Sequence, residues 1–540
     1  MSRPSTKSRW SLSALALEPE PSTFASDSKW ARSNRDMDPV PPELQTWTTW
    51  NYIAYWISDA TNTATWELAS SMIAVGLSWR QALPAIAVGH IIIGSVMVLN
   101  GTIGARLHVA FPVITRSSFG FWFSYFAVVS RVVLSMFWFA IQSYTGSECV
   151  LVMLKAIWPG HIARIPNRLP ESAGISTVQM MSYFLFWLIQ LPFLLVSPQR
   201  IRYLFVLKAA IVPATWLAML IWAMHEAPPS VSLVPKHATL SGSAASWAWL
   251  SSLNSALGIY ATLAVNIPDF TRYAKNERAQ YVQMLVIPVA FTLAGFCGIA
   301  VASASEVLYG EVIWDPLQLI DRWDSRAASF FAALSFALAT LGTNISANSL
   351  SAANDMTVLL PKYINIRRGQ VLCAIIGGWA LCPWEILSSA PGFLTFMSGY
   401  TIFLGPFAAI MCIDYWIVHQ CKVDVPAMYD PNGRYHYWNG INWRAAIALL
   451  FSVTPGLPGL AASINPSINV GKAARIFDIG WLYGFFVAGV LYWGLSTLFP
   501  AKETYLEEVN LGKQDRDSIE NEKDGSVVYS RTYDQDLLMM

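Results

Sequence analysis

The chain has 540 residues, of which 54% are hydrophobic and only 13% are charged, and its mean hydropathy is +0.41. Because a soluble globular chain carries about 25% charged residues, this composition excludes a string of soluble domains and indicates a protein that crosses a membrane many times. The formal net charge of +1 argues against a nucleic-acid partner. The six cysteines contain no CxxC pair, which argues against a disulfide or zinc framework.

Apolar segments long enough for membrane-spanning helices of about 20 residues fill the middle of the chain. A polar stretch without the apolar core of a signal peptide precedes them, and a charged stretch follows them. We predict an all-α polytopic membrane protein, with disordered cytoplasmic tails at 1–43 and 501–540 and a twelve-helix domain at 44–500. The predicted spans are 48–77, 81–100, 121–156, 177–197, 202–224, 246–270, 283–305, 328–357, 371–389, 393–418, 443–463 and 477–499.

The loops between these spans indicate which side of the membrane the termini occupy. An even number of spans places both termini on one side. If that side is the cytoplasm, the inner loops hold more Lys and Arg than the outer loops, which is the usual bias. The sequence therefore predicts a multi-pass protein with both termini in the cytoplasm.

Two of the predicted spans look interrupted. The first contains SDATNTATWELASS, which crowds polar residues from Asp59 to Glu67, and the sixth contains Gly258, Asn266 and Pro268. Irregular backbone at membrane depth survives only where it lines a cavity or is buried in protein. Discontinuous helices one and six are typical of transporters built from inverted repeats, although the repeat itself is not visible in the sequence.

The third and eighth spans carry polar residues at helical spacing. Trp138 and Gln142 lie four apart, and Asn344, Asn348, Ser351 and Asp355 follow at steps of four, three and four. Polar groups in hydrocarbon are costly unless they are paired or line a cavity. A carboxamide can pair with an N–H/C=O edge, and an indole face adds stacking worth about 1–3 kcal/mol. The alternative is helix packing by Trp138 and hydrogen bonds between helices by the amides.

These and other stretches resemble one family. DPVPPELQTWTTWNY, NGTIGARLHVAFPVITRSSFG, FWFAIQSYTGSE, NIPDFTRYAK and LGTNISANSLSAANDM are similar to the nucleobase–cation symporter family one, in the fungal branch of uracil, allantoin and uridine permeases. The resemblance covers roughly residues 40–500. It implies a leucine-transporter-type fold, with two inverted repeats of five helices plus two further helices, and a substrate site between spans one, three, six and eight.

The resemblance also implies the site residues. Trp138 and Gln142 fall on the family's stacking and hydrogen-bonding pair of span three, and Asn348 falls on its substrate-binding Asn of span eight. The second stacking aromatic falls on or near Tyr260. The gate of span ten, in FMSGYTIFLGP, falls on Met397 and Tyr400.

The coupling ion is predicted to be a proton. Sodium-coupled relatives have a Ser-Thr pair where this chain has Gly342 and Thr343, so Thr343 is at most a vestigial cation ligand. Glu67 is the candidate coupling carboxylate, since burial would raise its affinity for a proton; the alternative is a structural ion pair with Lys208. Asp355 either couples or gates transport, or forms a salt bridge at the cytoplasmic interface.

The sequence thus predicts a plasma-membrane permease rather than an enzyme, with no cofactor other than the coupling proton. It would import uracil, allantoin or uric acid by proton symport. The alternatives are a uridine or thiamine-type carrier, a channel, and a non-transporting nutrient sensor. The expected partners are the lipid bilayer, the small substrate and a ubiquitin ligase acting on the tails at Lys502, Lys513 and Lys523.

Overall fold

The computed structural model describes residues 15–17, 33–196, 198–227 and 239–512. All regular structure in these residues is helical, with only isolated β-bridges. The first five predicted spans correspond to α1 (Thr49–Ala60) with α2 (Thr63–Ala74), α3 (Trp79–Leu107), α5 (Ser124–Ile157), α7 (Thr177–Leu195) and α8 (Pro198–Glu226). The next five correspond to α9 (Gly242–Asn266), α11 (Gln283–Tyr309), α13 (Arg326–Thr343) with α14 (Leu350–Leu359), α15 (Ile366–Trp379), and α17 (Ala390–Gly399) with α18 (Thr401–Ile413).

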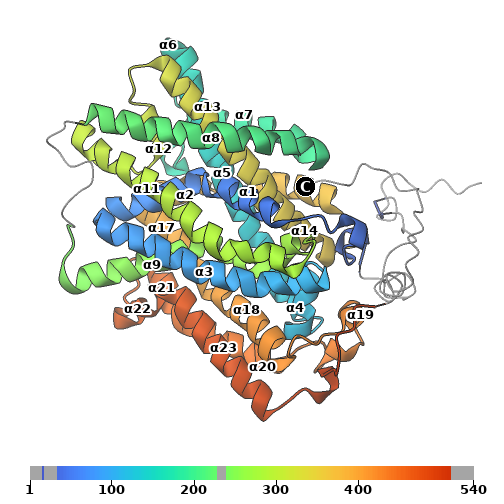
Figure 1. Ribbon diagram of the computed structural model, residues 1–540. Coiled ribbons are helices and arrows are strands. Elements are labelled where there is room, and N and C mark those ends of the chain that lie inside the picture. The colour runs from blue at the N-terminus through green and yellow to red at the C-terminus, as the bar shows by residue number, and fades with distance from the viewer. Residues whose placement is uncertain (1–14, 18–32, 197, 228–238, 513–540) are drawn as a thin grey trace, which may run out of the picture.

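The last two predicted spans correspond to α20 (Trp443–Val453) with α21 (Leu457–Ile464), and to α23 (Gly480–Leu498). They lie at one edge of the molecule, drawn in red in Figure 1, where α20 and α23 pack against α18. Helices α7 and α8 lie at the opposite edge (Figure 1). Short helices connect the spans: α4 (Phe111–Phe119), α6 (Pro159–Ile162), α10 (Pro268–Thr271), α12 (Pro316–Ile320), α16 (Pro383–Ile386), α19 (Val425–Tyr429) and α22 (Ala474–Phe477).

Within the described residues, 10 helical segments are long and apolar enough to cross a membrane. The two predicted spans that are not among them are the first and the ninth. The first is divided into α1 and α2, of 12 residues each, and the ninth, α15, has 14 residues. The count of twelve therefore depends on counting a broken helix and a short helix as spans.

The break in the first span is where the sequence predicts it, and Asn62 holds it together. Asn62 has extended backbone and caps α2 by accepting a hydrogen bond from the backbone N–H of Thr65. Its amide nitrogen donates to the carbonyl oxygen of Asp59, 2.5 Å away at the end of α1. One side chain thus satisfies backbone groups on both sides of the break, which a membrane interior requires.

The sixth span differs from the prediction. Helix α9 continues through Gly258 to Asn266, and the interruption comes only at Ile267, before Pro268 opens α10. Gly258 has a packing role, because a Cβ there would lie 2.4 Å from the carbonyl oxygen of Met397. The glycine allows span ten to approach α9 closely.

The eighth span contains a π-helix, η6 (Asn344–Ser349), between α13 and α14. A π-turn inserted in an α-helix is rare and is found most often at functional sites. It places Asn344 and Asn348 on one side of the helix, with the amide nitrogen of Asn348 donating to Asn344 Oδ1 over 2.9 Å.

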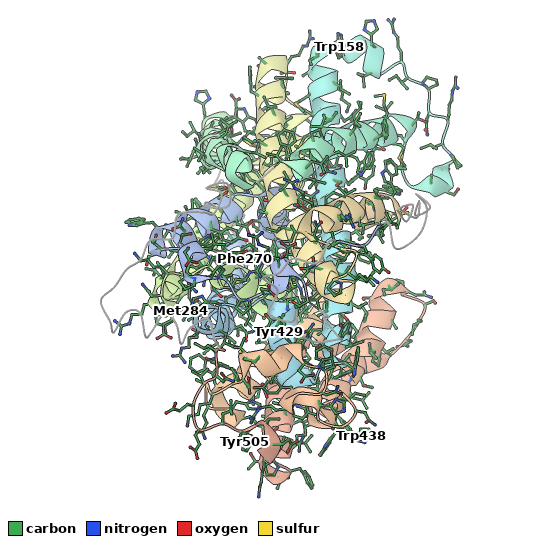
Figure 2. All side chains as sticks on the ribbon, turned by 90° about the vertical axis from the view of Figure 1, so that its right-hand side faces the viewer. Trp158, Phe270, Met284, Tyr429, Trp438 and Tyr505 are labelled. Atoms are coloured by element: carbon green, nitrogen blue, oxygen red, sulfur yellow. The ribbon has the colours of Figure 1, made fainter. Side chains whose placement is uncertain are left out.

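Parts of both predicted tails are ordered, which corrects the prediction of disorder throughout 1–43 and 501–540. Met37 is fully buried, and its carbonyl oxygen accepts a hydrogen bond from the Tyr429 hydroxyl. The backbone N–H of Val425, in the same connection, donates to the carbonyl oxygen of Asn510. Both terminal segments therefore pack on the loop 423–442. We call this side of the molecule the terminal face; Figure 2 views it, with Tyr429 and Tyr505 labelled.

Candidate substrate-binding site

A cavity lies between spans one, three, six and eight, with about 500 Å³ of empty space that includes the open solvent at its mouth. All four predicted substrate-binding residues line it. The lining residues are Asp59, Asn62, Ala64, Arg131, Ser135, Trp138, Gln142, Ile259, Tyr260, Thr262, Leu263, Asn266, Thr343, Ala347, Asn348 and Ser351.

Gln142 and Trp138 bring polar atoms to this cavity without hydrogen-bond partners. Gln142 Oε1 is buried and accepts no hydrogen bond from any described residue. Trp138 Nε1 is also buried; it faces Tyr400, but no contact with a described residue has the geometry of a good hydrogen bond. Buried polar groups are nearly always hydrogen-bonded, so such exceptions need an explanation. A ligand in the cavity that offers an N–H to Gln142 and an acceptor to Trp138 would supply one.

The Trp138 ring is supported from span ten. Phe396 packs edge-on against it, with ring centroids 5.7 Å apart and an angle of 69° between the planes. Tyr400, between α17 and α18, lies 6.5 Å away, and its hydroxyl donates to the carbonyl oxygen of Gly258 over 2.9 Å. Met397 is fully buried. Tyr400, predicted for the gate, therefore contacts the site from span ten without lining the cavity, and Phe396, which the sequence analysis missed, is a further contact. Met397, the other residue predicted for the gate, approaches Gly258 instead.

Asn348 is held in place by Asn344. The Asn344 amide nitrogen lies within hydrogen-bond distance of three acceptors: Phe139 O, Ser143 Oγ and Gln190 Oε1, at 3.2, 3.2 and 3.0 Å. Its carboxamide oxygen in turn accepts from Asn348. Asn344 thus links helices, and Asn348 is the amide of this pair that reaches the cavity.

Tyr260 joins the cavity to the break in span one. Its hydroxyl accepts a hydrogen bond from the Asn62 amide over 2.9 Å and donates to the carbonyl oxygen of Asp59 over 3.2 Å. Phe291 packs edge-on against the ring, with centroids 4.5 Å apart. Because the hydroxyl is used in these bonds, the ring is the part of Tyr260 that remains to contact a ligand.

The structure places Lys208 and Glu67 apart and gives Lys208 other neighbours. The buried Lys208 ammonium donates to Thr343 Oγ1 over 2.9 Å. Asp59 is the acidic group that interacts with it electrostatically. Glu67 lies on α2, buried but outside the cavity lining, and its Oε2 has no hydrogen-bond partner among the described residues. The predicted alternative of a Glu67–Lys208 ion pair is therefore wrong, because Lys208 faces Thr343 and Asp59.

Asp355 forms an ion pair with Arg131. The Nε and Nη2 atoms of Arg131 each lie 3.1 Å from Asp355 Oδ2, and both side chains are buried. Arg131 Nη1 also donates to the carbonyl oxygen of Thr262. The pair joins spans three, six and eight inside the protein, whereas the sequence analysis placed a possible salt bridge of Asp355 at the membrane interface.

Asn266 is a further cavity residue that the sequence analysis did not assign to the site. Its amide nitrogen lies within hydrogen-bond distance of Asp269 Oδ2 and Ser351 Oγ, at 3.1 and 3.2 Å, while its Oδ1 is buried without a partner among the described residues. Its position two residues before Pro268, where the helix was expected to break, is the feature of the sequence that could have pointed to it. Asp59 and Asn62 were likewise visible only as members of a polar cluster.

Comparisons with known proteins agree with this geometry. A family model described as permease for cytosine/purines, uracil, thiamine, allantoin matches residues 39–484. The allantoin permease of Saccharomyces cerevisiae is 36% identical over 87% of this chain and 76% of its own length. The uracil permease of the same yeast is 36% identical over 86% of this chain and 76% of its own length.

Among solved structures, Mhp1, a nucleobase-cation-symport-1 family transporter solved in a closed conformation with bromovinylhydantoin bound, superposes with a TM-score of 0.67. It is 21% identical to this chain and covers 87% of it, and the match covers 97% of Mhp1. At this identity the likeness shows the fold alone. It confirms the all-α, leucine-transporter-type architecture.

Proposed function

The chain belongs to the family of permeases for cytosine and purines, uracil, thiamine and allantoin, and on that premise we propose that it imports a neutral nucleobase-like compound by proton symport. It is a multi-pass membrane transporter and not an enzyme. The proposed substrates are uracil, allantoin and uric acid. The observation that carries the proposal is the unpartnered Gln142 Oε1 beside the Trp138 indole in one cavity.

The charges that line the cavity favour a neutral substrate. Asp59 is matched by Lys208, and Asp355 is paired with Arg131. A cationic substrate such as thiamine would need an unmatched carboxylate, since an ion taken out of water must be paired. Neutral N–H and C=O groups, in contrast, suit the free acceptors on Gln142 and Asn266 and the Trp138 N–H donor.

The Lys208 ammonium supports proton coupling. It donates to Thr343 Oγ1, the hydroxyl that remains of the Ser-Thr pair of sodium-coupled relatives. A second cation beside an ammonium in a low-dielectric interior is repelled by several kcal/mol, on the order of 4 kcal/mol at 4 Å for an effective dielectric constant of 20. Asp59 lines the cavity and interacts electrostatically with Lys208, so the gain or loss of a proton by Asp59 can be linked to loading of the substrate. Glu67 is the second candidate carboxylate.

Proton coupling is tested by uptake in cells that express the chain. Uptake should fall as external pH rises, should be suppressed by a protonophore, and should not change when sodium is replaced by choline. Asp59→Asn should flatten the pH dependence, whereas Glu67→Gln, the matched carboxylate-to-amide control outside the cavity, should keep it. Sodium-dependent uptake with a flat pH profile would contradict the proposal. A flat profile in Glu67→Gln alone would assign coupling to Glu67.

The proposed location is the plasma membrane, with the terminal face in the cytoplasm, which the excess of Lys and Arg in the inner loops supports. Lys502 lies exposed on this face and is available to a ubiquitin ligase. Lys513 and Lys523 lie outside the described residues. Competition of unlabelled uracil, allantoin, uric acid, uridine and thiamine against one radiolabelled uptake would identify the substrate. Saturable accumulation against a gradient would distinguish a carrier from a channel or a sensor.

A further inference from the structure

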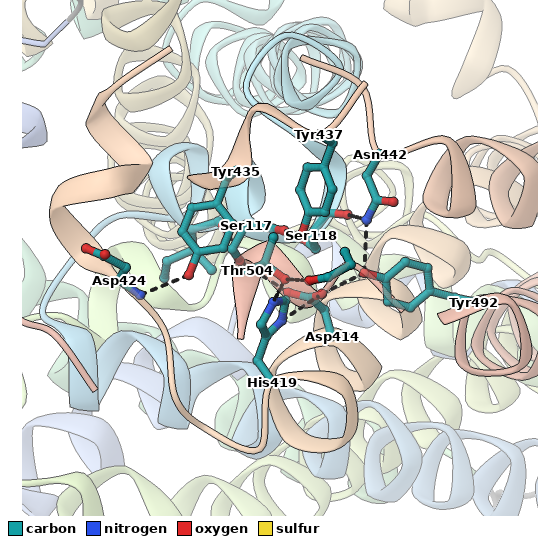
Figure 3. A network of polar contacts seen from close by, with 12 residues as sticks. Ser117, Ser118, Asp414, His419, Asp424, Tyr435, Tyr437, Asn442, Tyr492 and Thr504 are labelled. Carbon is teal, nitrogen blue, oxygen red and sulfur yellow. Dashed lines mark hydrogen bonds and ion pairs between the residues drawn. The ribbon is translucent and has the colours of Figure 1, made fainter. Parts of the chain in front are cut away.

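A buried polar network on the terminal face joins the end of span ten to the C-terminal segment (Figure 3). Its centre is Asp414, the first residue of the π-helix η7 (Asp414–Val418) that follows α18. Asp414 Oδ1 accepts a hydrogen bond from the Tyr492 hydroxyl over 2.6 Å, and Oδ2 accepts from Ser117 Oγ over 3.3 Å. His419 Nδ1 makes an ion-pair contact with Oδ1 at 3.1 Å.

The other side of the His419 ring contacts Thr504, in the short helix η11 (Lys502–Thr504) after the last span. His419 Nε2 lies 2.9 Å from Thr504 Oγ1, and both side chains are buried. Thr504 Oγ1 also donates to the carbonyl oxygen of Ala501 over 2.8 Å. One imidazole ring therefore bridges span ten and the C-terminal segment.

The protonation of His419 decides how strongly its ring holds Thr504. A carboxylate only accepts, so Nδ1 beside Asp414 carries a proton in either charge state. When Nε2 is protonated as well, it donates a charge-assisted hydrogen bond to Thr504 Oγ1; when it is not, the Thr504 hydroxyl turns from Ala501 and donates to it. A charge-assisted hydrogen bond is roughly twice as strong as a neutral one, so the link to the C-terminal segment is stronger while both ring nitrogens carry a proton.

Further contacts fasten the C-terminal segment to the loop 423–442. Arg434 Nη1 donates to the carbonyl oxygens of Glu503 and Tyr505 over 3.0 and 3.2 Å. The backbone N–H of Asn510 donates to the carbonyl oxygen of Val423 over 3.0 Å. These bonds are to the backbone and do not change when His419 titrates. His419–Thr504 is thus the titratable link within this set of contacts.

The groups that face His419 decide its charge. Burial acts to lower the pKa of His419, but the Asp414 carboxylate outweighs burial, and Arg434 opposes it only weakly, so the pKa lies above its usual value. The rings of Tyr435 and Tyr505 pack edge-on at 6.0 and 5.9 Å. Asp414 lies in the π-helix that His419 ends, so it keeps the ring charged whether or not Thr504 is bound. The stronger hydrogen bond to Thr504 is present while the ring is charged and is lost as pH rises through the raised pKa.

We propose that the segment 501–512 is a pH-dependent latch on the terminal end of span ten, closed while His419 carries two ring protons and weakened when it loses one. Span ten also carries Phe396 and Tyr400 beside the substrate cavity. The latch therefore makes the helix that borders the site sensitive to the pH of the compartment at the terminal face. This inference does not depend on the identity of the substrate or of the coupling ion.

Hydrogen exchange on the purified full-length protein in nanodiscs tests the latch. Exchange of residues 501–512 is measured at pH 6 and pH 8, and each value is divided by the exchange of a free peptide with the same sequence at that pH. Protection should fall between pH 6 and pH 8, by about tenfold for each unit by which latching raises the pKa of His419. Equal protection at the two pH values would overturn the proposal.

Three variants test whether His419, rather than another residue of the terminal face, causes the pH dependence. His419→Gln keeps a hydrogen-bond donor but cannot be charged, so its protection should be the same at pH 6 and pH 8. Thr504→Val removes only a hydroxyl from the terminal segment and should be weakly protected at both values, which keeps the test decisive if His419→Gln fails to fold. His436→Gln, in the same loop, is the matched control and should behave as wild type. Retained pH dependence in His419→Gln or in Thr504→Val would contradict the latch.

Discussion

The buried oxygens of Gln142 and Asn266 at the central cavity and those of Asp414 on the terminal face differ in whether they accept hydrogen bonds. In the cavity, Gln142 Oε1 and Asn266 Oδ1 have no partner among the described residues, whereas on the terminal face both carboxylate oxygens of Asp414 accept hydrogen bonds. A satisfied buried network stiffens a protein, and an unsatisfied polar atom costs free energy until something binds it. The difference indicates that the cavity is built to receive a polar ligand and the terminal face to hold segments together.

The largest expected effect comes from the ion pair beside the cavity. Asp355→Ala leaves the buried Arg131 guanidinium unpaired, which costs about 3–5 kcal/mol of stability. We expect the protein to be lost from the cell surface and its melting temperature in detergent to fall. The double variant Arg131→Met with Asp355→Leu should recover much of that stability without recovering uptake. An Asp355→Ala protein as stable as wild type would show that the pair is not a structural element.

The next largest effect tests the terminal face. Tyr492→Phe removes one hydrogen bond to the Asp414 carboxylate, worth about 1.5–3 kcal/mol. Stability should fall by that amount, while the apparent affinity for substrate stays at the wild-type value. Thermal unfolding and uptake kinetics of the same preparation check both. If Tyr492→Phe weakened affinity at unchanged stability, the contrast between the two regions would fail.

In the cavity the pattern should reverse. Gln142→Ala removes an oxygen that no described residue bonds, so stability should be unchanged or slightly higher. Apparent affinity should fall by about 1–3 kcal/mol, or roughly 5- to 150-fold. Asn348→Ala should weaken affinity similarly. Since it also removes a partner of Asn344, it should lose some stability too. Surface-expressed variants with wild-type affinity would remove these residues from the site.

The smallest effect is expected for the stacking ring. Trp138→Phe keeps an aromatic face and should lower affinity less than Trp138→Ala, which loses stacking worth about 1–3 kcal/mol. Apparent affinities measured from uptake in the two variants check this order. Equal losses in Phe and Ala would indicate that the indole N–H, rather than the ring face, binds the substrate.

Much of the fold could be predicted because each span is recognisable from its own run of apolar residues. The break at Asn62 could be predicted because polar residues are concentrated around it. The gathering of Trp138, Gln142, Tyr260 and Asn348 could be expected only through the family resemblance, since the four lie on three separate helices. No local pattern in the sequence reports which helices adjoin.

The features that the sequence analysis missed depend on contacts between distant segments. The role of Gly258 depends on the Met397 carbonyl, and the neighbour of Lys208 is Thr343 on another helix. The segment 501–512 is polar and looks disordered by composition, yet it is ordered by the loop on which it packs. The π-turn at Asn344–Ser349 was hidden because steps of four and three also fit an ordinary α-helix.

The most direct test of the central claim is whether Gln142 accepts a hydrogen bond from the substrate. Once the competition panel has identified the substrate, its inhibition constant is compared with those of its mono-N-methylated analogues, in wild type and in Gln142→Ala. We predict that wild type discriminates against at least one analogue by about 5- to 150-fold and that Gln142→Ala loses that discrimination. Discrimination of the same size in both proteins would contradict the account.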